Sequence, residues 1–67
     1  MKPESRLEIA RRRVAEAENL VERQAQLVSE LQQRGGPTVQ AISLLALLHG
    51  SLSAYRDALD MMEVPMR

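Results

Sequence analysis

His49 is the side chain in this sequence best suited to proton transfer, because it is the only histidine and histidine titrates near neutral pH. Ser51 and Ser53 lie close to it along the chain and could supply a nucleophile. A general base also needs an orienting partner and a pocket, and the sequence contains neither a glycine-rich phosphate loop nor a nucleophile elbow. We therefore predict no catalytic residue and no enzymatic activity, with His49 partly buried at an interface.

The residue types of the chain also give little indication of a metal or cofactor site. The chain has no cysteine and one histidine, and its carboxylates are scattered along the sequence. A lone histidine with dispersed carboxylates is not a recognisable ligand set. The sequence predicts no metal site and no cofactor.

The run Arg11-Arg12-Arg13 is the most prominent charge feature. The first and third of three successive helical residues point about 200° apart, so the three arginines do not form one basic face. Glu8 and Glu16 lie four residues on either side of Arg12 and partly neutralise it. We predict a solvated, salt-bridged surface here. The alternative is a small nucleic-acid-associated or regulatory protein that uses the arginines of this region, namely Arg6, Arg11, Arg12 and Arg13.

The length and charge of the chain limit the possible classes of protein. It has 67 residues, with nine basic against nine acidic side chains and no net charge. This balance disfavours nucleic acid and anionic membranes as partners. One small domain fits this length, and a core of that size is marginal without disulfides, metals or oligomerisation. Since disulfides and metals are disfavoured, oligomerisation remains.

Targeting and membrane segments are not expected. The first residues run directly into charged sequence, without the apolar segment of a signal peptide. The uncharged stretch 35–55 is long enough to span a bilayer, but about half of it is not lipophilic. We predict no transmembrane helix and a cytoplasmic location.

The tripeptide Gly35-Gly36-Pro37 divides the chain into two helices. Glycine commonly follows a helix end, and proline fits only the start of the next helix. We predict one domain over residues 1–67, with helix 1 at about 3–34, a turn at 35–37 and helix 2 at about 38–62. Pro3 would lie in the first turn of helix 1, and either Gly36 or Thr38 would cap helix 2.

Both predicted helices carry a heptad-like apolar series, which is typical of a left-handed helix pair. In helix 1 it comprises Leu7, Ala10, Val14, Ala17, Val21, Gln24, Val28 and Leu31, and in helix 2 it comprises Ala41, Leu45, Leu48, Leu52, Tyr55, Leu59 and Met62. A short turn makes the pair antiparallel. The expected register places Gln24 opposite Leu48, and it brings Glu18 near Arg56 and Arg11 near Glu63. The fold class is therefore an all-α, coiled-coil-like antiparallel hairpin.

Two further features bear on register and packing. Gln24 is a polar residue inside the seam, a position that commonly sets register and oligomeric state. Its partner would be a second Gln24 across a two-fold axis or a backbone group. Helix 2 also carries small residues every four positions, at Ala46, Gly50, Ala54 and Ala58. This ridge could allow close helix packing, or Gly50 could mark a kink or be incidental.

The apolar residues outside the seam indicate where the hairpin associates. We predict that they form one contiguous patch near the turn and make the dimer interface, comprising Leu20, Leu27, Ile42, Leu44 and Leu47. Two-fold association would produce a four-helix bundle. A higher oligomer or a different protein partner are the alternatives. The predicted function is a non-enzymatic, homo-oligomeric interaction or structural module.

Part of the chain also resembles a known family. The matching positions are Glu18, Val21, Arg23, Gln24, Leu27, Val28, Leu31, Gly35, Thr38, Ala41, Leu44 and Leu45, followed by Ser51 and Leu52. This pattern, over roughly residues 14–55, resembles short uncharacterised bacterial proteins, often alphaproteobacterial. The Arg23-Gln24 pair, Gly35 and Thr38 are its least generic parts. Members often have Asp before the threonine, where this chain has Pro37, which affects helix capping. The resemblance implies a helical hairpin in a bacterial cytoplasm and adds no activity.

Overall fold

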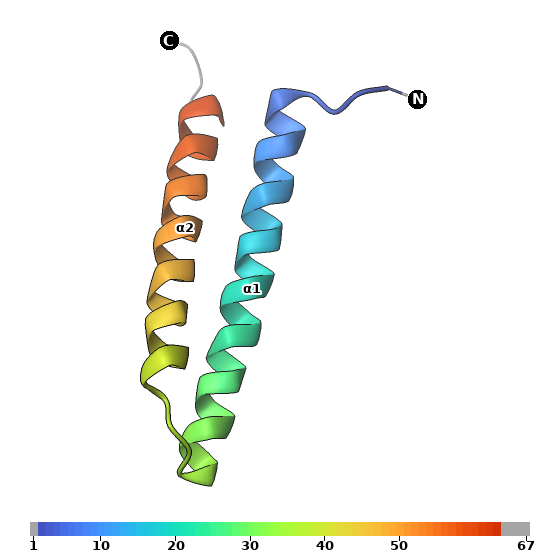
Figure 1. Ribbon diagram of the computed structural model, residues 1–67. Coiled ribbons are helices and arrows are strands. Elements are labelled where there is room, and N and C mark those ends of the chain that lie inside the picture. The colour runs from blue at the N-terminus through green and yellow to red at the C-terminus, as the bar shows by residue number, and fades with distance from the viewer. Residues whose placement is uncertain (1, 64–67) are drawn as a thin grey trace.

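The protein is a helical hairpin. The computed structural model describes residues 2–63 and contains two helices, α1 (Arg6–Arg34) and α2 (Val39–Glu63). The helices lie side by side and antiparallel, so Arg6 and Glu63 share one end, which we call the open end, and the connecting segment forms the turn end (Figure 1). There is no strand between residues 2 and 63. The all-α hairpin predicted from the sequence is confirmed.

α1 begins three residues later than predicted because Ser5 caps it. The Ser5 hydroxyl accepts a hydrogen bond from the Glu8 backbone N–H at 3.1 Å, and the Ser5 backbone N–H donates to the Glu8 carboxylate at 3.0 Å. This reciprocal pair is a capping box, which satisfies two backbone donors that the helix leaves unpaired. Pro3 therefore precedes the helix, and the prediction that it lies in the first turn is wrong.

Gly35 ends α1 at the predicted residue. Its φ of 72° is in the left-handed region, which glycine reaches without steric cost. The Gly35 and Gly36 N–H groups donate to the carbonyls of Gln32 and Leu31 at 3.2 and 2.9 Å. These two bonds are the Schellman pattern, which satisfies the last carbonyls of the helix.

Thr38 occupies the capping position of α2. Its carbonyl accepts a hydrogen bond from the Ile42 N–H at 2.8 Å, the first bond of the helical ladder. Of the two predicted caps, the structure therefore uses Thr38 and not Gly36. The helix runs from Val39 to Glu63, so the predicted bounds of 38–62 are displaced by one residue at each end.

The predicted seam is the contact between the helices. Every predicted seam residue of α1 is buried or half-buried, as are the first four of α2 and Leu59. The most enclosed cluster comprises Val14, Ala17 and Leu52, with Val21 and Leu59 packed against it. Tyr55 and Met62 differ from the prediction, since 39% and 50% of their surfaces are exposed. They lie toward the open end, where the two helices enclose less of each side chain.

The axial register differs from the prediction. Gln24 is buried, and its Nε2 donates to the Ala41 carbonyl at 2.8 Å, seven residues before the expected Leu48. The difference arises in the connecting segment, which runs back along the last turns of α1 before α2 begins (Figure 1). Gln24 thus uses a backbone partner, one of the two predicted.

Two predicted ion pairs form despite this offset. Arg11 Nε lies 3.0 Å from Glu63 Oε1, and Arg56 Nη2 lies 2.9 Å from Glu18 Oε2. Arginine and glutamate are long enough to reach along the helix axis as well as across the seam. Both pairs are exposed, so each contributes only about 0–1 kcal/mol.

The hairpin is one layer thick. The shortest dimension of its Cα trace is 14 Å, and no side chain of the described residues is completely buried. Even Leu52, the most enclosed core residue, retains 5% exposure. A stable domain normally packs two layers around a core, and a lone hairpin has only its seam. No helix between residues 2 and 63 has the length and apolarity needed to cross a membrane.

Substitutions of Gln24 test the role of its hydrogen bond. Gln24→Leu removes the amide at similar volume, and we expect the free energy of unfolding to change by less than about 1 kcal/mol. Gln24→Glu places an anion against the Ala41 carbonyl oxygen, and we expect a loss of roughly 1–3 kcal/mol at pH 7. Urea denaturation of the two variants measures the difference. Equal losses would contradict a specific amide-to-carbonyl bond.

The capping box predicts a local pH dependence. Hydrogen bonds from Ser5, chiefly from its backbone N–H, lower the pKa of Glu8 below its ordinary 4.5. Because the folded-state pKa is depressed, the stabilisation is present above pH 4.5 and is lost as the pH falls through the lower value. The NMR shift of the Ser5 amide proton should titrate with a midpoint below 4.5. Glu8→Gln should abolish that titration, and a midpoint at or above 4.5 would contradict the cap.

Candidate interaction surface

The hairpin has two broad sides, and we call the first the ion-pair side. It carries the bridges Arg11–Glu63 and Glu18–Arg56 across the seam. Residues spaced by seven lie on the same side of a helix, two turns apart. His49 precedes Arg56 by seven residues and Ile42 precedes it by fourteen, so both belong to this side.

The opposite side carries exposed leucines, and we call it the leucine side. Its large apolar residues are Leu20, Leu27, Leu44 and Leu47, with exposed fractions of 49, 44, 46 and 70%. Leu20 lines a groove together with Leu48 and Ser51, which fixes its side. The other three follow from helical spacing to Leu20 or to Ser51.

The structure therefore separates the five predicted interface residues. Four of them share the leucine side, while Ile42, 44% exposed, lies on the ion-pair side near His49. The prediction of a single patch rested on the number of apolar residues near the turn. It did not take account of their angular positions around α2. Ile42 and Leu44 are two residues apart, which is about 200° of rotation on a helix.

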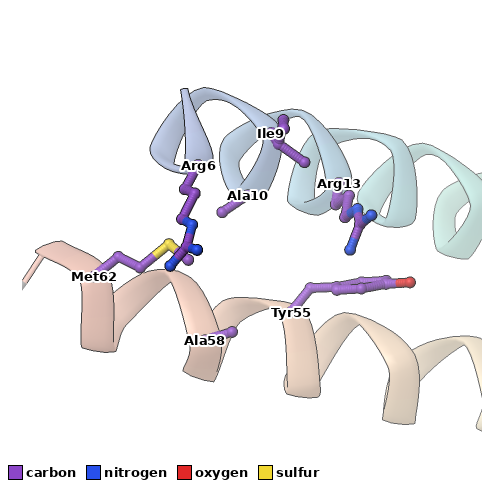
Figure 2. A pocket seen from close by; sticks show the side chains of 7 residues that line it. All are labelled: Arg6, Ile9, Ala10, Arg13, Tyr55, Ala58 and Met62. Atoms are coloured by element: carbon purple, nitrogen blue, oxygen red, sulfur yellow. The ribbon is translucent and has the colours of Figure 1, made fainter. Parts of the chain in front are cut away.

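Two grooves lie between the helices on the leucine side. The first, at the open end, is lined mainly by Ile9, Ala10, Tyr55, Ala58 and Met62, and has a volume of about 230 Å³ (Figure 2). The second lies nearer the middle of the hairpin and has a volume of about 200 Å³. Its floor is formed by Ala17, Leu48 and Ser51. Both grooves occur where small residues of the two helices lie opposite each other.

The open-end groove was not predicted from the sequence, although the sequence contains two signals for it. Ala10 and Ala58 are small residues on facing helices, and Ile9 is an apolar residue beside the seam that the seam does not use. Ile9 is in fact half-buried. An open space beside alanines follows because alanine side chains cannot fill the gap between helix backbones.

Arg6 and Arg13 stand at the rim of the open-end groove. Both extend from α1 toward α2, Arg6 toward Met62 and Arg13 toward Tyr55 (Figure 2). Within residues 2–63 neither makes an ion pair, whereas Arg11, Arg12, Arg34 and Arg56 do. The groove thus combines an apolar floor with two available cations.

The three successive arginines form no common basic face, as predicted. Arg12, however, pairs with Glu4 and Glu16 and not with Glu8. Arg12 bonds Glu4 through Nε and Nη2 at 3.2 and 3.1 Å, and Glu16 through Nη1 at 2.9 Å. Glu8, the other predicted partner, is engaged in the capping box. The bonds to Glu4 and Glu16 raise the pKa of the Arg12 guanidinium. Arg11, Arg12 and Arg13 point to three different surroundings and form no common basic face.

His49 lies on the surface of the hairpin. It is exposed in the single chain, where the sequence analysis expected partial burial at an interface. It stands on the ion-pair side, away from the two grooves described above. No group of three or more potential metal-binding side chains occurs within residues 2–63.

Three residues of the small-residue ridge face away from α1, whereas the fourth, Ala58, lines the open-end groove. Ala46, Gly50 and Ala54 are all exposed, and Gly50 is two residues, or about 200°, from the buried Leu52. A Cβ at Gly50 would meet nothing within 4 Å, and α2 continues unbroken through this residue. Ala46, Gly50 and Ala54 therefore have no packing role inside the hairpin, and Gly50 does not break the helix.

The surface area of the chain exceeds that of a compact protein. It exposes 5697 Å², whereas a compact folded monomer of 7.5 kDa exposes about 4,250 Å². The excess of roughly 1,400 Å² includes the surface of residues that precede α1 as well as the exposed sides of the two helices.

Comparisons with protein-family models, with curated proteins and with solved structures found no match to this chain. The resemblance to short bacterial proteins stays a prediction.

Replacing Gly50 by alanine tests whether the ridge is free. Because the added methyl group meets no neighbour and alanine favours the helix, we expect the free energy of unfolding to rise by up to about 1 kcal/mol. Thermal and urea denaturation measure this change, and light scattering should show an unaltered mass. A lower stability together with weaker association would place the ridge in an interface instead.

Proposed function

We propose that this protein is a small, non-enzymatic interaction module that acts as a homodimer. Two hairpins pack their leucine sides together and form an antiparallel four-helix bundle. The observation that carries the proposal is the set of four exposed leucines on one side of a one-layer fold. Burying a leucine contributes about 1.5–3 kcal/mol, so these residues, counted in both copies, supply a large driving force.

The charges support the choice of side. The ion-pair side is covered by Arg11, Glu18, Arg56 and Glu63, whose heads are exposed and solvated. Burying such pairs in an interface costs desolvation that their mutual attraction seldom repays. The leucine side carries no such bridge across the seam within residues 2–63. A dimer that covers it leaves the ion pairs in water.

The working surface of such a module would be the part of the helices that the dimer does not cover. The resemblance to bacterial hairpin proteins and the absence of cysteine support a bacterial cytoplasmic location as part of this proposal. A higher oligomer or a different protein partner on the same leucines would use the same apolar contacts.

The nucleic-acid alternative has weaker support. Arg11 and Arg12 are engaged in ion pairs, which leaves Arg6 and Arg13 of the original four. Those two line an apolar groove and not an open basic strip. Fluorescence anisotropy with duplex DNA at two salt concentrations tests it, because phosphate contacts weaken steeply with salt.

Leu44 and Ile42 provide a matched pair for testing the dimer. Their exposed fractions are 46 and 44%, they lie two residues apart, and they stand on opposite sides of the hairpin. We expect Leu44→Asp to raise the dimer dissociation constant at least about 100-fold, since each interface loses two buried leucines and gains two charges. We expect Ile42→Asp to leave dissociation nearly unchanged.

Light scattering and sedimentation at micromolar concentration measure the outcome, with circular dichroism to verify that both variants remain helical. The unmodified chain should have twice its 7.5 kDa mass. A helical monomer would overturn the proposal, as would equal effects of the two substitutions.

A further inference from the structure

Large and small residues are distributed unevenly along the leucine side. Three of the exposed leucines, Leu27, Leu44 and Leu47, belong to the half of the hairpin nearer the turn end, and Leu20 lies at the middle of α1 beside the second groove. The open-end groove, over Ala10 and Ala58, belongs to the other half, and the second groove, over Ala17 and Ser51, lies near the middle of the hairpin. Each groove is larger than the ~150 Å³ that accommodates a benzene molecule, so each has room for a leucine side chain. The turn half thus carries most of the projections, and the recesses lie from the middle to the open end.

Three cations on this side make no ion pair among residues 2–63: two lie in the open half, and the third, Arg23, lies beside Leu20. Arg6 and Arg13 stand at the open-end groove without an ion pair among residues 2–63. Glu30 lies in the turn half, fourteen residues after the groove residue Glu16 and therefore on the same side of α1. Its bridge to Arg34 is long, at 3.8 Å, and exposed. Glu30 can therefore take a second cation at little cost.

Two symmetric arrangements of the proposed dimer are possible. With the two-fold axis along the helices, both turns lie at one end, leucines meet leucines, and the grooves of both copies face each other. That arrangement also gathers four arginines, two copies each of Arg6 and Arg13, at the open end. With the axis across the helices, the turn half of each hairpin covers the open half of the other. Leucines then meet grooves, and Glu30 of one copy approaches Arg6 of the other.

We propose that two copies of this chain pack head to tail, with the turn half of each leucine side filling the grooves of its partner. The proposal rests on the homodimer proposed above and adds its orientation. The second copy is the occupant of the grooves because it supplies both the apolar projections and the carboxylate that the rim arginines attract. In this orientation Glu30 approaches Arg6 of the second copy, and the two open ends with their Arg6 side chains are kept apart, which favours it over the orientation that gathers them.

Spin labels measure this orientation directly. The chain has no cysteine, so Gln33→Cys provides a single labelling position, exposed near the turn end of α1. The middle of the overlap lies near residues 18–20 of α1, about 20 Å along the helix from position 33. Head-to-tail dimers should therefore give a label-to-label distance of about 40 Å, whereas a dimer with both turns together should give less than about 25 Å. Pulsed electron resonance separates the two values.

A charge reversal gives a second measurement. We expect Arg6→Glu to raise the dissociation constant roughly fivefold at low salt, and Glu30→Arg in the same chain to restore it. Glu22→Arg is the matched control, because Glu22 lies four residues after Glu18 on the ion-pair side and should not restore binding.

The outcomes separate the two proposals. A dimer with the long label distance and rescue by Glu30→Arg supports the orientation. A dimer with the short distance overturns the orientation and leaves the proposed homodimer standing. A labelled chain that is helical and monomeric by light scattering overturns both, and assigns the leucine side to a different partner.

Discussion

Every feature of this protein depends on the fact that two helices share only one line of contact. Each helix buries the residues that face its neighbour, about two in every seven, and leaves the rest in water. The Cα trace is therefore only 14 Å thick, and no side chain of the described residues is completely buried. Stability must then come from good helix ends, from a well-filled seam and from whatever covers the remaining apolar surface.

Specific hydrogen bonds stabilise both ends of α1 and the seam. Ser5 and Glu8 satisfy backbone groups at the start of α1, and the Schellman turn at Gly35 does so at its end. Gln24 joins the two elements where α2 begins, through its bond to the Ala41 carbonyl. These contacts specify the hairpin but do not enclose it, since they all lie along or at the ends of one seam.

The two sides of the hairpin complete the seam in different ways. On the ion-pair side, long charged side chains span from one helix to the other and keep their heads in water. On the leucine side, small residues leave grooves, and the leucines project without a partner in the chain. The first side is spanned by ion pairs within the single chain, with Ile42 as its one large exposed apolar residue among those placed on it. The second is the surface on which the proposed association depends.

Helical spacing in the sequence predicts the angular position of most residues. A spacing of 3.5 residues predicted the seam almost completely, and Gly35 predicted the end of α1. The cap at Ser5 was also readable, as Ser followed three residues later by Glu, but Pro3 was assigned to the first turn instead. The axial register follows from the folded structure, whereas the separation of Ile42 from Leu44 is already contained in their spacing of two helical residues. The physical reason is that periodicity specifies rotation about a helix axis, whereas register depends on the path of the connecting segment. The side on which a residue lies depends on the neighbour that it faces.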